Sequence, residues 1–328
     1  MKCTNNFRRI FTIIICVTLI VTTLVGCGNK EYSFAYDRSR NNSSFSTASH
    51  LSENTQDAFA AGLCVTINDV TTGTDVDMSQ ATAAGLFDLD GKRTIYAKNV
   101  HEKLNPASLT KILTAVCALE YGNLDDVLTA SENVKITESG AVKLGLEAGD
   151  TMTMEQALHA LLLKSANDVA VMIAEHVGGS VEGFAEMMNE MANRLGATNS
   201  HFVNPNGLTD PNHYTTVYDL YLICNEALKY DKFLEVIHTS TYNSVYHNKA
   251  GGEKTIDLET TNAYIKGEAF APDNVSVIGG KTGTTQAAGS CLIIYARDSA
   301  GKPYISVILQ APDRTTMYTE MTDLLGEI

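Results

Sequence analysis

GSCLIIYARDSAGKPYISVILQ, residues 289–310, has the pattern of two strands joined by a turn. Apolar and β-branched residues fill 289–297 and 303–310, and the DSAGK between them is typical of a turn. Three further strands are predicted near the start of the folded part, at 62–70 (GLCVTINDV), 83–90 (AAGLFDLD) and 91–99 (GKRTIYAKN). The folded part of the chain therefore begins and ends with strands.

Helical periodicity replaces this pattern in the middle of the chain. The first of these helices opens with a capping box formed by Thr153 and Gln156, and the third is capped by Ser180. Helices are predicted at 151–163, 167–179 and 180–196, with a last one at 315–328. Strands at both ends with helices between them predict one sheet covered by helices, an α+β fold in a single domain.

Composition limits the function classes. The chain has 328 residues, of which 44% are hydrophobic and 19% charged, as in a globular protein with a sizeable core. Its formal net charge of −14 disfavours binding to nucleic acid, or to an anionic membrane surface, by charge alone.

The N-terminus is predicted to be a secretion signal. Three basic residues precede an apolar run at 10–25, which is short for a membrane-spanning helix. The run ends in LVGC, which resembles the bacterial lipobox, where the signal is cleaved and the cysteine is lipidated. We therefore expect a signal peptide at 1–26, a lipidated Cys27 with a flexible polar tether at 27–60, and a catalytic domain at 61–328. Lipid would then hold an exported protein on the outer face of the cytoplasmic membrane.

Metal and cofactor chemistry is not expected. The cysteines that follow Cys27 are widely spaced and form no C-x-x-C, and the eight histidines form no H-E-x-x-H. Cys117 and Cys291 lie in apolar runs and are predicted to be buried free thiols, although the sequence leaves a disulfide open.

Nucleophile chemistry is indicated by NPASLTKILTA, residues 105–115. Asn105 suits a helix N-cap and Pro106 the first helical position, which would place Ser108 in the first turn. Backbone N–H groups there can bind an oxyanion. Lys111, three residues on, shares a face with Ser108 and could act as its base if burial removes its charge.

Two further motifs follow along the chain. Ser165 and Asn167 interrupt two strongly apolar helices in LLLKSANDVAV, although they could also simply cap the second helix. The same S-x-N spacing at Ser131 is a competing candidate. In VIGGKTGTTQAAGSC, Lys281 and Gly283 share one face of a predicted strand, where a cation could hold a carboxylate and a glycine would allow close backbone approach. The alternative is a glycine-rich hairpin with an exposed lysine.

The order S-x-x-K, S-x-N, K-T-G is the signature of penicillin-binding proteins and serine β-lactamases. NPASLTKILTA, FVNPNGLTDPNHYTTVYDL and GGKTGTTQAAGSC resemble the low-molecular-weight D-alanyl-D-alanine carboxypeptidases over roughly 80–312. The resemblance implies a five-stranded antiparallel sheet sandwiched by helices, with a mostly helical insertion. Many members also carry a C-terminal β-rich domain with an amphipathic membrane helix. Since this chain ends soon after the matched part, we expect the N-terminal lipid to serve as its anchor.

The resemblance also implies roles for these residues. Ser108 would attack the carbonyl between two D-alanines of a peptidoglycan stem peptide, with Lys111 as base. Ser165 and Asn167 would relay protons and position the peptide, while Lys281 and Thr282 would hold its terminal carboxylate on the strand that contains Gly283. The oxyanion hole would consist of the N–H groups of Ser108 and Thr284. β-Lactams would acylate Ser108 and inhibit the enzyme.

Three alternatives remain at this point. A class A β-lactamase would usually have S-D-N at the second motif and a glutamate in a later loop, whereas this chain has S-A-N and no acidic residue at 201–208. A DD-endopeptidase would use the same residues. A non-catalytic wall-binding or β-lactam-sensing lipoprotein would be expected to lose the serine or the lysines, unless it kept the acylation chemistry.

Overall fold

The computed structural model describes residues 60–72 and 76–328, which belong to one compact unit. The predicted signal peptide, Cys27 and the tether up to residue 59 lie outside the described residues. Among the described residues, no helix is long and apolar enough to cross a membrane.

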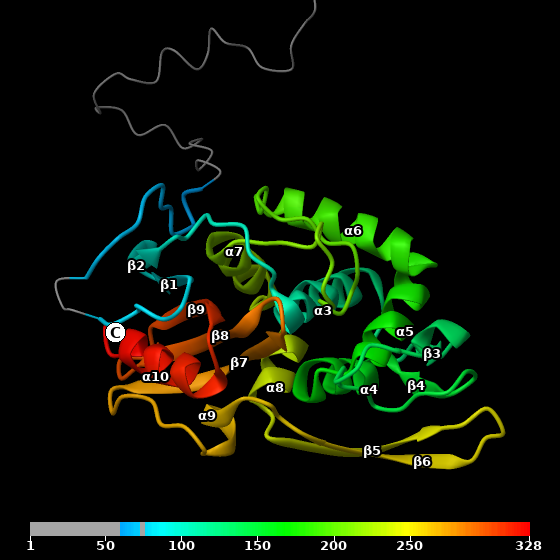
Figure 1. Cartoon of the computed structure of the whole chain (residues 1–328). Helices are drawn as coiled ribbons and strands as arrows, with labels where there is room; N and C mark the ends of the chain where they lie inside the picture. Colours follow the sequence, from blue (N-terminus) through cyan, green and yellow to red (C-terminus); the bar gives the residue numbers. More distant parts are fainter. Residues whose placement is uncertain (1–59, 73–75) are drawn as a thin grey trace, which may run out of the picture. The chain divides into compact units, whose positions relative to one another are not determined.

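The predicted strands form a five-stranded antiparallel sheet of order β2-β1-β9-β8-β7, in which the first hairpin pairs with the last strand of the chain (Figure 1). This sheet confirms the predicted fold class. Its strands are β1 (Ala83–Asp88), β2 (Arg93–Lys98), β7 (Val275–Thr285), β8 (Gly289–Asp298) and β9 (Pro303–Ala311).

The strand predicted at 62–70 is wrong. Only Val70 pairs with the sheet, through an isolated bridge to Ala97. The backbone N–H of Cys64 instead donates to the Tyr221 hydroxyl, at 2.8 Å, and the Thr66 carbonyl contacts a histidine ring. Because side chains satisfy these backbone groups, the segment lies along the domain without extending the sheet.

Helices cover both faces of the sheet (Figure 1). The helices of the described residues are α3 (Thr110–Tyr121), α4 (Met154–His159), α5 (Asn167–Gly178), α6 (Val181–Arg194), α7 (Val217–Ala227), α8 (Asp231–His238), α9 (Ala263–Lys266) and α10 (Arg314–Leu325), of which α7, α8, α9 and α10 pack against strands of this sheet. A 3-10 turn, η1 (Ala107–Leu109), precedes α3, and a second, η2 (Glu132–Val134), follows β3. A π-helical turn, η3 (Ala160–Lys164), continues α4.

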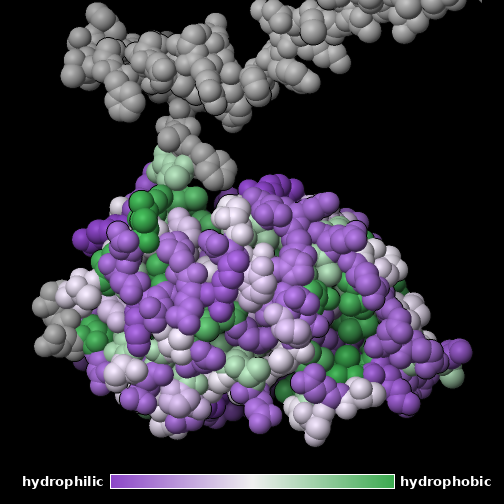
Figure 2. Space-filling model, turned by 45° about the horizontal axis from the view of Figure 1, so that its top comes forward, coloured by the Kyte–Doolittle hydropathy of each residue, from purple (hydrophilic) through white to green (hydrophobic). Residues whose placement is uncertain are grey.

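The side chains of β8 point alternately to the two faces of the sheet, which explains why helices pack on both faces. Ile293 and Tyr295 pack into the core that contains α3 and α7, whereas Leu292 and Ile294 pack beneath α10. Burial of apolar side chains on both faces is the main force that holds the helices to the sheet. On the face drawn in Figure 2, hydrophilic residues predominate and hydrophobic ones gather in smaller areas.

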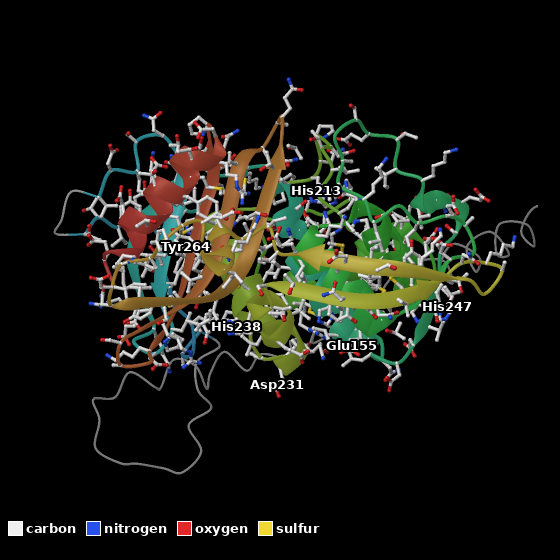
Figure 3. All side chains as sticks on the ribbon, turned by 90° about the horizontal axis from the view of Figure 1, so that it is seen from below. Glu155, His213, Asp231, His238, His247 and Tyr264 are labelled. Carbon is white, nitrogen blue, oxygen red and sulfur yellow. The ribbon has the colours of Figure 1, made fainter. Side chains whose placement is uncertain are left out.

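A second antiparallel sheet, of order β3-β4-β5-β6, was not predicted. Its strands are β3 (Val127–Thr129), β4 (Thr151–Thr153), β5 (Thr241–His247) and β6 (Glu253–Glu259). The hairpin β5–β6 lies across the helical part in the view of Figure 3. Three-residue strands are too short to show a period, but the alternation of β5 and β6 around an Asn-Gly-rich turn was a usable signal.

Local signals for the helices are confirmed. Thr153 and Gln156 form the capping box of α4, so α4 begins at Met154, and residues 151–153 are β4. Ser180 caps α6, and Gly179 ends α5 in the left-handed conformation, with φ +74°. Cysteines 64, 117, 224 and 291 are buried free thiols, which confirms the prediction for Cys117 and Cys291 and leaves no disulfide among the four.

Candidate active site

Ser108 and Lys111 lie in hydrogen-bond contact at the start of α3. The Lys111 Nζ is 2.9 Å from the Ser108 Oγ, 2.8 Å from the Asn167 Oδ1 and 2.5 Å from the Asn206 carbonyl oxygen. The Asn167 Oδ1 and the Asn206 carbonyl oxygen can only accept, so they take two N–H groups of the amine. The third position of the nitrogen faces the serine hydroxyl, where a neutral amine presents its lone pair.

Electrostatics favour this neutral form. Burial lowers the pKa of Lys111 well below its ordinary value, and the nearby charge of Lys281 lowers it further, against an opposing effect of Asp168. The lysine is fully buried, so its charged form has no water to solvate it. The pair therefore has the geometry and the proton affinity of a nucleophile with its general base.

The local structure around Ser108 differs from the prediction. Ser108 lies in the 3-10 turn η1, and α3 begins only at Thr110. Asn105 acts on this turn, since its Oδ1 accepts the Ala107 N–H at 3.0 Å. The left-handed backbone of Ala107, with φ +47°, prevents the α-helix from beginning at Pro106.

The second motif reaches the same place. Ser165 follows the π-helical turn η3 and has φ +67°, a left-handed conformation that is uncommon for a residue with a side chain. Its Oγ accepts from the Lys281 Nζ at 3.0 Å, while Asn167 contacts Lys111. The N-cap of α5 is Ala166, without a side-chain bond, so the capping interpretation of Ser165 is wrong.

The competing motif at Ser131 has a structural role. Its Oγ accepts the Asn133 N–H at 2.9 Å and donates to Glu175 at 2.7 Å. Asn133 Nδ2 also donates to Glu175. This serine therefore caps η2 and fastens it to α5.

The third motif forms the edge strand β7 beside these residues. Lys281 is only 1% exposed, so the alternative of an exposed hairpin lysine is wrong. Burial, together with the charge of Arg314, lowers the pKa of Lys281 to about 7. Its Nζ donates to Ser165 and to the Thr282 carbonyl, at 2.8 Å.

Gly283 allows β7 to approach the nucleophile. A Cβ at this position would lie 3.0 Å from the Ser108 nitrogen and 3.1 Å from the Pro106 carbonyl oxygen, too close for most side chains. Thr282 contacts Thr261 through their hydroxyls, at 2.7 Å. Thr284, the next residue towards the end of β7, is exposed and pairs with Ser290. The three predicted motifs thus meet around Ser108.

Sequence reasoning missed three residues of the site. Asn206 acts through its backbone carbonyl, for which the sequence carries no signal. Asp168, 1% exposed, accepts three backbone N–H groups of the 144–146 segment and so holds that segment against α5. Arg314 donates to the Thr261 carbonyl at 2.6 Å. A lone arginine in the first turn of a helix, where the dipole disfavours a cation, was a usable signal.

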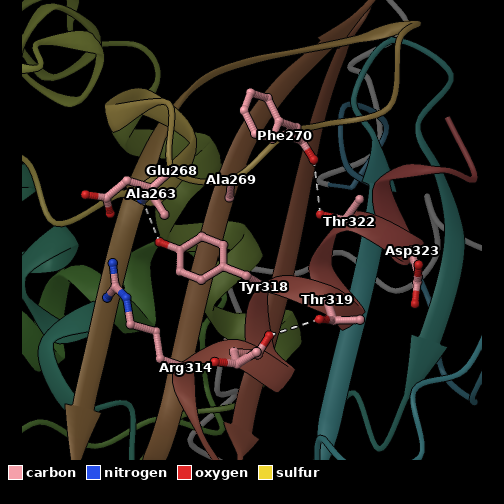
Figure 4. A pocket seen from close by; sticks show the side chains of 10 residues that line it. Ala263, Glu268, Ala269, Phe270, Arg314, Tyr318, Thr319, Thr322 and Asp323 are labelled. Atoms are coloured by element: carbon pink, nitrogen blue, oxygen red, sulfur yellow. Dashed lines mark hydrogen bonds between the residues drawn. The ribbon is translucent and has the colours of Figure 1, made fainter.

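A pocket of about 520 Å³ lies elsewhere, between α9 and α10 (Figure 4). Its lining includes Phe270, Tyr318 and Arg314 but no pair of a nucleophile and a base. Arg314 lines this pocket and also acts on the charge of Lys281. No group of His, Cys, Asp and Glu in the described part of the chain could hold a metal ion.

A hydroxyl nucleophile, a buried lysine base and an edge strand with a second buried lysine define the site of a serine acyl-transfer enzyme. The family model described as D-alanyl-D-alanine carboxypeptidase matches residues 69–313, and the chain belongs to this family.

Named relatives agree with this assignment. D-alanyl-D-alanine carboxypeptidase DacF of Bacillus subtilis is 34% identical over 74% of this chain and 61% of its own length. DacC of Escherichia coli is 30% identical over 73% of this chain and 59% of its own length. This chain thus spans about three fifths of these two relatives. The crystal structure of the Streptomyces K15 DD-transpeptidase is 26% identical, covers 80% of this chain and 98% of its own, and has a TM-score of 0.70.

Proposed function

We propose that this chain is a serine-type D-alanyl-D-alanine carboxypeptidase that removes the terminal D-alanine from peptidoglycan stem peptides. The observation that carries the proposal is the 2.9 Å contact between the Ser108 Oγ and the amine of the buried Lys111. Family membership supports the choice of substrate class.

Acylation begins with proton transfer from Ser108 to the neutral Lys111. The Oγ attacks the carbonyl carbon of the D-Ala-D-Ala bond, and the developing oxyanion accepts hydrogen bonds from the N–H groups of Ser108 and Thr284. The close approach of β7 at Gly283 supports this pairing of donors. Each such donor typically contributes about 3 kcal/mol to lowering the barrier.

The terminal carboxylate is held by Lys281 and Thr282, with Arg314 as a further cation beside them. Ser165 contacts the Lys281 amine and can pass a proton towards the leaving D-alanine nitrogen. The bond between the serine oxygen and the acyl carbon forms as the peptide C–N bond breaks. Water then hydrolyses the ester and restores Ser108. A β-lactam imitates the dipeptide and acylates the same oxygen.

The primary test is D-alanine release from diacyl-L-Lys-D-Ala-D-Ala by a chain that starts at Gly28, beside the same chain with Ser108→Ala. We expect release and covalent labelling by fluorescent penicillin from the first and neither from the second. Penicillin labelling of S108A at the normal rate would refute the nucleophile assignment. A β-lactamase would release hydrolysed penicillin rapidly without keeping the label.

The molecule that accepts the acyl group from Ser108 is identified in the same assay. Addition of glycylglycine separates hydrolysis from transfer to an amine, a distinction prompted by the DD-transpeptidase name of the Streptomyces K15 relative. Cross-linked peptide dimers test for endopeptidase activity. Penicillin labelling without any peptide turnover would favour a β-lactam sensor.

Export and anchoring by a lipid on Cys27, at the outer face of the cytoplasmic membrane, are also proposed. The LVGC motif after an apolar run supports this location. The full chain should incorporate labelled palmitate and sediment with membranes, whereas C27A should do neither. Palmitate incorporation into C27A would exclude this cysteine as the lipidation site.

A further inference from the structure

The residue before the nucleophile has a strained backbone that its surroundings must maintain. Ala107 is fully buried and has φ +47°, a conformation that costs a residue with a Cβ about 1–2 kcal/mol. Such strain persists only when neighbouring groups over-determine it. The groups that hold Ala107 therefore also set the direction of the Ser108 N–H and side chain.

Three contacts act on the Ala107 carbonyl oxygen, and one of them is the backbone N–H of Thr110, which donates to it whatever the side chain. Gly207 presses against it so closely that a Cβ there would lie 1.8 Å away. The Thr110 hydroxyl donates to it at 2.8 Å. Since a hydroxyl has one proton, the Thr110 oxygen is left as an acceptor for its remaining contact.

That contact is the imidazole of His213, whose Nε2 lies 2.9 Å from the Thr110 Oγ1. The Val203 backbone N–H donates to the His213 Nδ1 at 3.2 Å. Nδ1 is therefore the acceptor, and Nε2 bears the single proton of a neutral ring. His213 is 1% exposed, packs edge-to-face on Phe202 and is labelled in Figure 3. Burial lowers the pKa of His213 to about 4, in agreement with the neutral ring.

We infer that His213 is a positioning residue for Ser108, because a directed chain of hydrogen bonds, Val203 N–H to His213, His213 to Thr110, and Thr110 to the Ala107 carbonyl, holds the turn that presents the nucleophile. The inference rests on the proposed function. His213 does not serve as a base in it, since its only proton is given to Thr110 and its lone pair to Val203.

This chain of hydrogen bonds also connects two parts of the fold. Val203 and His213 belong to the segment between α6 and α7, which pairs with residue 104 through Thr215 and supplies the Asn206 carbonyl to Lys111. The same segment thus sets both the base and the turn of the nucleophile. A displaced turn would misalign the reacting atoms, and a misplacement of about 1 Å can cost about 100-fold in rate.

The test is the acylation of Thr110→Val by fluorescent penicillin, followed by stopped flow. Valine keeps the shape of threonine but has a methyl group in place of the hydroxyl, so both hydrogen bonds of the Thr110 Oγ1 are lost. We expect the acylation rate constant to fall about 10- to 100-fold, while the noncovalent dissociation constant changes less than about threefold, because Lys281 and Thr282 are untouched. Thr110→Ser should restore most of the rate.

Histidine variants test the hydrogen bond between His213 and Thr110. His213→Leu should slow acylation as T110V does, and His213→Gln, which keeps a donor for Thr110, should recover it. The double variant T110V/H213L should be no slower than the slower single variant, because both break one chain. His159→Leu is the matched control: His159 is also buried and bonded through one ring nitrogen, to the Glu155 carbonyl, and should lose stability without losing acylation.

The outcomes separate this inference from the proposed function. If penicillin does not acylate the wild-type protein, both the inference and the proposed function are refuted. Equal acylation rates in wild type and T110V, or rate losses in T110V and H213L that multiply in the double variant, would refute the inference alone. If H213L does not fold, the acylation rates of T110V and T110S alone test the inference. Nitrogen-15 NMR of the wild type should show the Nε2–H tautomer of His213, and the Nδ1–H tautomer would overturn the chain.

Discussion

Replacement of Lys281 by methionine should change how stability depends on pH. The folded protein lowers the pKa of this lysine to about 7, whereas in the unfolded chain it is near its ordinary value of about 10.4. Between these values the unfolded state binds the proton and the folded state does not. Stability that depends on Lys281 must therefore rise with pH, starting near pH 7.

The magnitude follows from the same difference. Each pH unit well inside this window contributes about 1.4 kcal/mol, and the slope is half of that at the folded-state pKa near 7, so wild type should gain about 2 kcal/mol over K281M between pH 7 and pH 9. Below pH 6 the lysine is charged in both states, and the difference between the two proteins should become flat. Burial of the lysine side chain, at 1% exposure, is the cause of this effect.

Urea unfolding at a series of pH values from 5.5 to 9 measures this difference. Lys302→Met is the matched control, since the side chain of Lys302 is exposed and the variant should keep the wild-type pH dependence. A free-energy difference between wild type and K281M that does not change with pH would refute the reasoning. In catalysis, the KM for peptides with a free carboxylate should rise above about pH 7, and that of their amides should not.

Arg314→Leu should raise the pH at which the KM begins to increase, because the guanidinium charge helps to lower the pKa of Lys281; an unchanged KM–pH profile would contradict this coupling. Gly207→Ala should cost at least about 2 kcal/mol of unfolding free energy, since its Cβ would collide with the Ala107 carbonyl and its φ is +80°. The control Gly145→Ala, also at positive φ but in open space, should cost about 1 kcal/mol, and similar losses in both would mean that backbone strain alone matters.

Patterns within single segments predicted much of the fold. The hairpin β8–β9 follows from two apolar runs around a polar turn, and the capping box at Thr153 and Gln156 places the start of α4. The strand prediction for 62–70 was wrong because alternation of apolar and polar residues indicates only that one side of a segment is buried. It does not indicate that the segment pairs with a neighbouring strand. Side chains of α7 and of the segment after β2 satisfy its backbone in place of a neighbouring strand.

The pairing of Ser108 with Lys111 is partly a local feature, because residues three apart on a helical turn share a face, whereas the strained turn that presents Ser108 is held by contacts from distant segments. The sequence by itself therefore predicted the candidate nucleophile and its base, together with the order of the three motifs. Spacing alone does not separate Ser131 from Ser165, which have the same S-x-N pattern, and the strongly apolar helices on both sides of Ser165 favoured it.

Tertiary structure supplies the physical reason for that choice, since Ser165 meets Lys281 across the site and Ser131 meets Glu175 away from it. It also decided the charge of the two lysines, which depends on complete burial and on residues distant in the chain. Burial and long-range contact form only when the sheet closes between the two ends of the folded part. A linear pattern holds no information on the dielectric around an amine, and that environment gives Lys111 the properties of a base.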